Sequence, residues 1–235
     1  MSVGSIRENT SLEKRVAVTP ETVKNITALG LSINLEKNYA VHLGIADSEY
    51  EVLGAKFYNS PSEVIDNSNL LLKVDCPTDE EIKSLKEKSI LIGIFNPTKN
   101  QFKLKEILKK KINIFSLELL PRISRAQSMD VLSSQSNLAG YRAVIESIYE
   151  FEKAVPMMMT AAGTVPAAKV LVIGAGVAGL QAIATAKRLG AVVSATDVRA
   201  TSKEQVESLG GKFLIVEQEE NLETAGGYAK EASEE

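Results

Sequence analysis

The chain has 235 residues, of which 44% are hydrophobic, so it can bury a substantial core. Its formal net charge of −3 supplies no long-range basic field, which argues against nucleic acid and anionic lipid as partners. The single cysteine, Cys76, excludes a disulfide framework and a thiolate metal site, and it fits a reducing cytosol. We expect no secretory signal at the N-terminus and no direct membrane insertion, because no apolar run approaches the roughly 20 residues of a spanning helix.

The first half of the chain alternates short apolar runs with helix start signals. Thr19 before Pro20 is typical of an N-cap followed by proline in the first turn, and Gly30 supplies a stop signal. Residues 77–81 repeat this start, with acidic side chains that complement the helix dipole. The apolar runs lie at residues 70–74, 90–95 and 112–115. This alternation predicts a parallel sheet, so we expect residues 1–125 to form one α/β domain.

A long helix is predicted to connect this domain to a second one. Apolar residues recur at helical spacing over residues 129–152, and we take residues 126–166 as a connecting helix and linker. Within the linker, Met157–Met159 is expected to pack at a contact between the domains. For residues 167–235 the pattern predicts strands at 169–173, 192–196 and 213–216 and helices at 177–189 and 201–209.

The expected fold class is therefore α/β, with two Rossmann-like parallel-sheet domains joined by a long helix. A complete dinucleotide-binding fold has two three-stranded halves, whereas only about three strands are predicted for residues 167–235. We therefore expect the second domain to be incomplete.

A Gly-x-Gly-x-x-Gly fingerprint begins at Gly174, directly after a predicted strand. Gly174 permits the tight turn, Gly176 lets the backbone approach a pyrophosphate, and Gly179 lets helix and strand pack closely. Asp197 ends the next predicted strand, where its carboxylate can accept hydrogen bonds from the adenosine ribose hydroxyls of NAD(H). Arg199 leaves an alternative open, because an arginine after this strand can instead bind the 2′-phosphate of NADP.

Several segments of the sequence resemble the NAD(H)-binding domain I of proton-translocating NAD(P) transhydrogenases, in their alpha subunit. The resemblance is most specific at residues 121–130, PRISRAQSMD. It continues through residues 132–135, 137–142, 160–163, 174–197 and 226–230.

This resemblance implies a component of a Re/Si-specific transhydrogenase. Domain I of that family is a homodimer that holds NAD(H), and hydride passes directly to NADP(H) on a partner, domain III. Membrane subunits couple this transfer to proton translocation. The chain is therefore expected to be cytoplasmic and peripheral to a bacterial inner membrane, or at the equivalent matrix face.

The resemblance also implies which residues bind the cofactor. Arg122, Gln127, Asp130 and Ser133 would position the nicotinamide end, and Arg122 with Asp130 could form an ion pair in this loop. The pyrophosphate and the adenosine ribose would be bound by residues 177–179 and 197–199, and the mobile loop with Gly227 and Tyr228 would fold over the nucleotide. The full cofactor-binding set is Arg122, Ile123, Ser124, Arg125, Gln127, Ser128, Met129, Asp130, Ser133, Gly174, Gly176, Val177, Ala178, Gly179, Asp197, Val198, Arg199, Gly227 and Tyr228.

Alanine dehydrogenases share this architecture and form the main alternative. Two of their substrate-binding positions occur here, as Arg15 and Lys73, which we interpret as structural residues. The position of their acid–base histidine is Asn96, and the one histidine of the chain, His42, lies in an early connection and is expected to be structural. A third reading is a non-catalytic NAD-binding fragment, because an incomplete second domain would expose apolar sheet surface.

Overall fold

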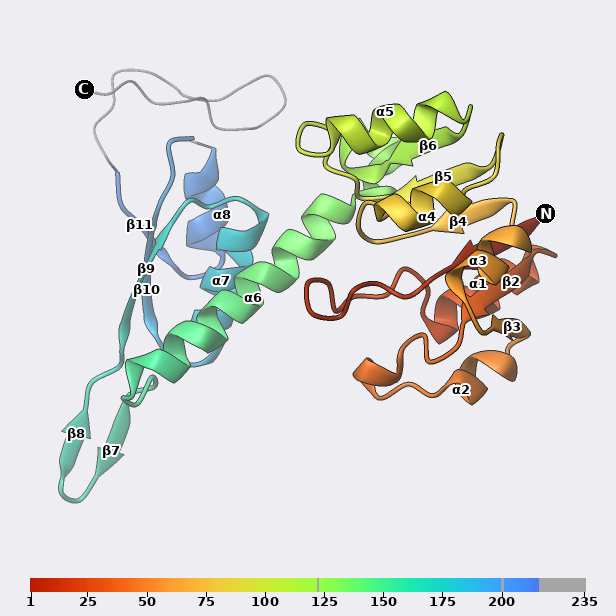
Figure 1. The fold of residues 1–235 in the computed structure, drawn as a ribbon. Coiled ribbons are helices and arrows are strands. Elements are labelled where there is room, and N and C mark those ends of the chain that lie inside the picture. Colours follow the sequence, from red (N-terminus) through yellow and green to blue (C-terminus); the bar gives the residue numbers. More distant parts are fainter. Residues whose placement is uncertain (122, 200, 216–235) are drawn as a thin grey trace. The chain divides into compact units, whose positions relative to one another are not determined.

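A computed structural model describes residues 1–121, 123–199 and 201–215 (Figure 1). The chain divides into two compact units, Met1–Met129 and Asp130–Glu235. Both are α/β structures built on parallel sheets, as the sequence predicted. Each unit has its own buried apolar core, the first with two clusters and the second with one.

The first unit contains a six-stranded sheet in the order β3-β2-β1-β4-β5-β6, and all of its neighbouring strands are parallel. The order reverses between β1 and β4, which is the topological switch point at which such sheets bind ligands. Its elements are β1 (Ser2–Ser5), α1 (Pro20–Ala28), β2 (Ser32–Glu36), η1 (Val41–Leu43), α2 (Asp47–Glu51), β3 (Ala55–Tyr58), α3 (Pro61–Asp66), β4 (Leu70–Leu72), α4 (Asp79–Ser84), β5 (Ile90–Gly93), α5 (Gln101–Lys109), β6 (Asn113–Ser116), η2 (Leu117–Leu119) and η3 (Ser124–Met129).

Two helix starts in this unit confirm the capping signals of the sequence. The Thr19 hydroxyl accepts a hydrogen bond from the backbone N–H of Thr22, and α1 ends just before Gly30, which has a φ of 77°. At α4, Thr78 and Glu81 form a reciprocal capping box. These local contacts fix where each helix begins.

The second unit contains a three-stranded parallel sheet in the order β11-β10-β9, with α7 and α8 as its connections. Its elements are α6 (Val131–Phe151), β7 (Met158–Thr160), β8 (Gly163–Val165), β9 (Lys169–Ile173), α7 (Val177–Arg188), β10 (Val192–Thr196), α8 (Ser202–Ser208) and β11 (Lys212–Phe213). The predicted strands 169–173 and 192–196 are confirmed residue for residue. Part of the third predicted strand, at Val216, lies outside the described residues.

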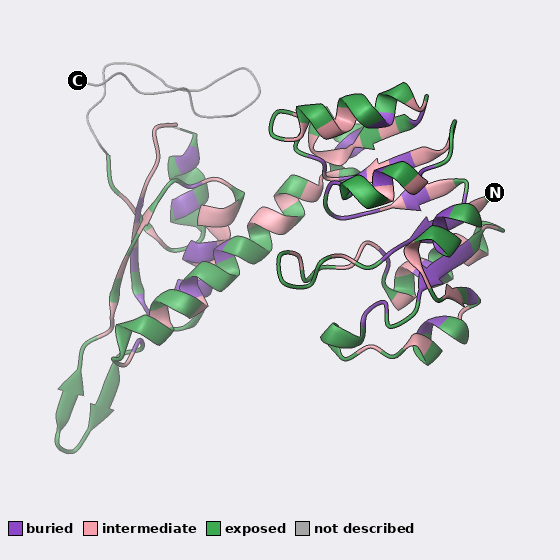
Figure 2. Ribbon diagram, in the orientation of Figure 1, coloured by how far each residue is buried: buried purple, intermediate pink, exposed green. Residues whose placement is uncertain are grey.

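A β-hairpin between α6 and β9 was not predicted from the sequence. Strands β7 and β8 pair in antiparallel orientation, and every residue of both strands is exposed (Figure 2). The expectation that Met157–Met159 packs was wrong, because these three side chains are exposed to 59%, 46% and 74%. An isolated two-stranded hairpin is only marginally stable in water.

Helix α6 packs closely against α7 at Gly140. A Cβ placed on Gly140 would lie 2.0 Å from the carbonyl oxygen of Ala178, so the contact requires a residue without a side chain. Val144, one turn further along α6, belongs to the same buried core as Ile183 of α7. This contact places α6 firmly in the second unit.

We predict that Gly140→Ala destabilises the protein by about 1–3 kcal/mol, because the methyl group forces the two helices apart. Helix propensity alone predicts the opposite sign, a gain of up to about 1 kcal/mol. Urea denaturation followed by circular dichroism measures the difference. Asn137→Ala on the exposed side of α6 is the matched control and should not be destabilising. A Gly140→Ala variant as stable as the wild type would contradict the close contact.

Candidate functional site

The glycine turn of the second unit joins β9 to α7 without a connecting loop. Gly174 has a φ of 92°, a left-handed conformation that glycine adopts without strain. A Cβ on Gly179 would lie 1.8 Å from the carbonyl oxygen of Gly174, so the third glycine is required by the contact between turn and helix. The first and third glycines therefore have the steric roles that the fingerprint predicted.

The N-terminus of α7 presents backbone N–H groups that no side chain caps. Gly176 is the N-cap, and it makes no side-chain hydrogen bond to the first turn, which contains Val177, Ala178 and Gly179. A Cβ on Gly176 would meet only the tip of Arg199, at 4.0 Å. The space above this glycine is therefore open enough for a ligand to approach the backbone. Free N–H groups and the helix dipole favour an anion such as a phosphate at this position.

Asp197 lies at the carboxyl end of β10 and contacts the glycine turn. Its Oδ2 accepts a hydrogen bond from the backbone N–H of Ala175 at 2.6 Å, and its Oδ1 accepts one from the backbone N–H of Arg199 at 2.8 Å. The Arg199 guanidinium donates to both oxygens, from Nε at 2.8 Å and Nη2 at 2.9 Å. Burial of the carboxylate raises its pKa, but these hydrogen bonds outweigh burial and lower the pKa of Asp197 to about 2. Asp197 is therefore ionised at neutral pH.

The contact of Asp197 with Ala175 was missed by the sequence analysis. The available signal was the position of Ala175 directly after the first glycine of the fingerprint, where its N–H points out of the turn. The structure thus brings together the glycine turn, Asp197, Val198 and Arg199 within the second unit.

The segment carrying the nicotinamide-end residues forms the 3-10 helix η3 at the end of the first unit. Its residues Ser124, Arg125, Gln127, Ser128 and Met129 are exposed, as is the preceding Ile123, whereas Ala126 is buried. Exposed polar side chains around one buried anchor are what a binding segment requires. Arg122, Gly227 and Tyr228 lie outside the described residues, so their predicted roles stay predictions.

Asp130 caps helix α6 through Ser133. Its Oδ1 accepts a hydrogen bond from the Ser133 backbone N–H at 2.9 Å, and its Oδ2 accepts one from the Ser133 hydroxyl at 2.6 Å. The pattern of an acidic residue three positions before serine is a capping signal that the sequence analysis did not use. These two residues therefore form a rigid pair at the start of the helix.

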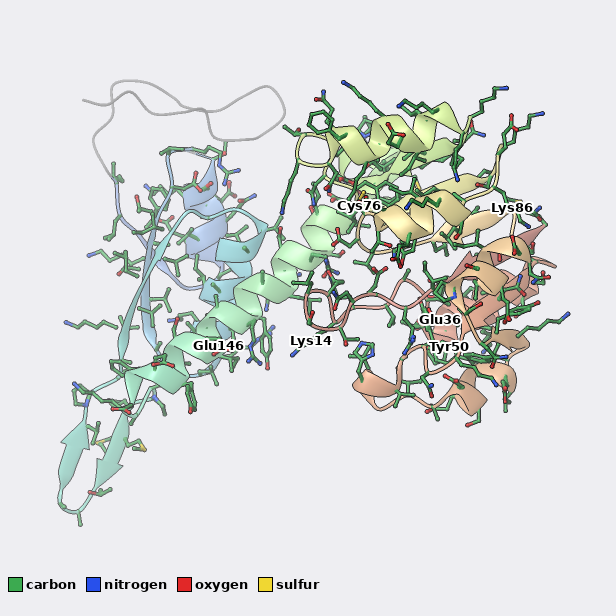
Figure 3. The ribbon with its side chains drawn as sticks, in the orientation of Figure 1. Lys14, Glu36, Tyr50, Cys76, Lys86 and Glu146 are labelled. Atoms are coloured by element: carbon green, nitrogen blue, oxygen red, sulfur yellow. The ribbon has the colours of Figure 1, made fainter. Side chains whose placement is uncertain are left out.

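A polar pocket of about 700 Å³ lies at the switch point of the first unit, at the carboxyl ends of β1 and β4. Figure 3 labels two of its lining residues, Glu36 and Cys76. Lys73 is buried in this pocket and pairs with Glu8 at 3.3 Å and Glu81 at 3.0 Å. Burial raises the pKa of Glu8, an effect opposed by the charge of Lys73. Two carboxylates thus surround this lysine.

The other residues that an amino-acid dehydrogenase would use are also held by protein groups. Arg15 is paired with Glu13, to which its Nη2 donates at 2.7 Å. Asn96 is exposed, and its backbone N–H donates to the carboxylate of Glu118. His42 donates from Nε2 to the carbonyl oxygen of Lys14 at 2.8 Å, which supports a structural role.

Within the described part of the chain, no helix is long and apolar enough to cross a membrane. Across residues 1–121, 123–199 and 201–215, no three metal-binding side chains gather in one place.

Comparison with known proteins identifies the relatives of this chain. Residues 4–139 match the family model for the alanine dehydrogenase/PNT N-terminal domain, and residues 143–231 match the model for its C-terminal domain. The first part of the NAD(P) transhydrogenase alpha subunit of Rhodospirillum rubrum is 51% identical over all of this chain and 63% of that protein. A crystal structure of transhydrogenase from Sinorhizobium meliloti has a TM-score of 0.88 and 49% identity, covering 92% of this chain and 64% of that one.

The alanine dehydrogenase of Methanococcus maripaludis is only 29% identical, over 84% of this chain and 53% of that protein. The chain spans less than two thirds of the length of each of these relatives. Because the two family models together cover nearly all of its residues, the chain belongs to the alanine dehydrogenase/PNT family.

Proposed function

We propose that this chain is the NAD(H)-binding component of a proton-translocating NAD(P) transhydrogenase. One observation carries the proposal: an uncapped helix N-terminus at a glycine turn lies beside an ionised Asp197. The helix N-terminus would bind the pyrophosphate, and the carboxylate would accept hydrogen bonds from the adenosine ribose. The identity of 51% to a transhydrogenase alpha subunit favours this family branch over alanine dehydrogenase.

The residues at the nicotinamide end would act by positioning alone. The bound dihydronicotinamide supplies the hydride, and direct transfer to NADP+ on a partner requires no general acid or base from the protein. The amide of Gln127 would hold the carboxamide, and Arg122 would order the loop in which both residues lie. Asp130 and Ser133, which already fix each other at the start of α6, would define one side of this site. Gly227 and Tyr228 would close over the nucleotide.

The proposed partners are a second copy of the chain, an NADP(H)-binding domain III and membrane subunits that couple the transfer to proton movement. The location would be peripheral to the cytoplasmic face of a bacterial inner membrane, or to the matrix face. The exposed apolar residues of the hairpin, Met158, Met159 and Val165, support a protein partner because a hairpin of this kind needs one for stability.

A second candidate is a non-catalytic NAD-binding polypeptide. It is favoured by the apolar face of β9, where Leu171 and Ile173 are exposed to 57% and 81%, together with Val192 at 54% on β10. Such exposure lowers stability unless another polypeptide covers the sheet. Transfer measurements with the NADP(H)-binding partner distinguish this candidate from an active component.

Asp197→Ala should weaken NADH binding by about 1–3 kcal/mol, the cost of losing a charge-assisted hydrogen-bond acceptor. Calorimetric titration of the 235-residue chain with NADH checks this prediction. Glu150→Gln, on the exposed surface of α6, is the control and should bind NADH as the wild type does. Equal NADH affinity in Asp197→Ala and wild type would remove Asp197 from the ribose site.

Gln127→Ala should slow hydride transfer more than it weakens NADH binding, because the amide orients the ring without supplying most of the binding free energy. Arg122→Ala should behave in the same way. The measurement is single-turnover transfer from NADH to NADP+ bound by the partner domain, with the chain saturated. An unchanged transfer rate in Gln127→Ala would contradict the positioning role.

Lys73→Met should lower the free energy of unfolding by about 3–5 kcal/mol, because it leaves two buried carboxylates without a cation. NADH affinity should stay unchanged, since Lys73 serves structure in this proposal. Lys24→Met on the exposed surface of α1 is the control. The alanine dehydrogenase alternative predicts instead that Lys73 binds substrate, so stabilisation of the wild type by pyruvate that Lys73→Met abolishes would contradict the structural role.

A further inference from the structure

The pair formed by Asp197 and Arg199 is the most tightly connected charged pair at the glycine turn. The carboxylate accepts four hydrogen bonds, from the backbone N–H groups of Ala175 and Arg199 and from Nε and Nη2 of Arg199. An ionised carboxylate has about four lone-pair positions in total. Hydroxyl groups of a ribose can therefore bind Asp197 only when Arg199 releases at least one of its side-chain hydrogen bonds.

The guanidinium of Arg199 lies at the mouth of the turn. Nη2 is the group that a Cβ on Gly176 would meet, at 4.0 Å, and the side chains of Asp197 and Arg199 are only 5% and 17% exposed. Arginine stays protonated under all ordinary conditions, and its planar fork matches a phosphate as well as it matches a carboxylate. The carboxylate of Asp197 thus occupies a fork that could otherwise bind a second anion.

We propose that Arg199 is a latent 2′-phosphate site that Asp197 holds closed, and that this pair determines the choice between NAD(H) and NADP(H). The inference rests on the proposed function, because it assumes that the nucleotide binds at this turn. In the wild type the carboxylate neutralises Arg199 and repels the dianionic 2′-phosphate. Without the negative charge of Asp197, the guanidinium is left without its counterion, directly where a 2′-phosphorylated adenosine would place its extra anion.

The expected ligand class is an adenine nucleotide with a phosphate on the 2′-oxygen. Asp197→Asn is the sharpest variant, because the amide oxygen can still accept the Ala175 N–H and so preserve the turn, while the charge that holds Arg199 is lost. Arg199→Met removes the guanidinium, and the double variant Asp197→Asn with Arg199→Met tests whether the two residues act through each other.

The experiment is a calorimetric titration of these variants and the wild type with NADH, NADPH and the fragments adenosine 2′,5′-bisphosphate and adenosine 5′-monophosphate. Asp197→Asn should bind NADPH and the bisphosphate at least about tenfold more tightly than the wild type does, the size of one charge-assisted hydrogen bond. This gain should disappear in the double variant. Glu13→Gln, which frees Arg15 from a comparable bidentate pair in the first unit, should give no gain.

The outcomes separate this inference from the proposed function. A wild type that fails to bind NADH overturns the proposed function, and the two fragments then still test Arg199 on their own. A folded Asp197→Asn variant that gains no affinity for the bisphosphate overturns the inference, as does a gain that persists after Arg199→Met. Melting temperatures of all variants establish that each of them is folded.

Discussion

The close approach of Gly179 to the carbonyl of Gly174 is the constraint on which the second unit depends. Because no side chain separates them, α7 starts directly at the end of β9 and its first N–H groups face the carboxyl edge of the sheet. The same tight turn brings the Ala175 N–H within reach of Asp197 on the neighbouring strand. One steric requirement therefore assembles the phosphate-binding turn and the ribose-binding carboxylate together.

The first unit has the complete strand order of a dinucleotide-binding sheet but a different switch point. After β1 the chain continues through Arg7 and Glu8, and its first helix begins only at Pro20, so no helix N-terminus faces the switch point. The pocket there is held by a buried lysine between two glutamates. The two units thus share an architecture, while only the second has the glycine turn that suits a nucleotide pyrophosphate.

Local signals in the sequence predicted most of the elements, and long-range contacts account for what was missed. Thr19 and Thr78 start helices as expected, because capping depends on residues three positions apart. The site's glycines and Asp197 were recognised because their spacing is local to one βαβ unit. The ion cluster of Lys73 joins distant segments, and the four-fold engagement of Asp197 depends on side-chain geometry that no spacing encodes. The exposed β7–β8 hairpin was missed since apolar methionines were expected to be buried.

The most direct test of the central claim is a crystal structure of the chain with NADH. The account predicts the pyrophosphate at the backbone N–H groups of Val177, Ala178 and Gly179. It also predicts an adenosine ribose hydroxyl on Asp197 in place of a hydrogen bond from Arg199. Density for the nucleotide away from the glycine turn, or a ribose that leaves Asp197 fully bound to Arg199, would contradict it.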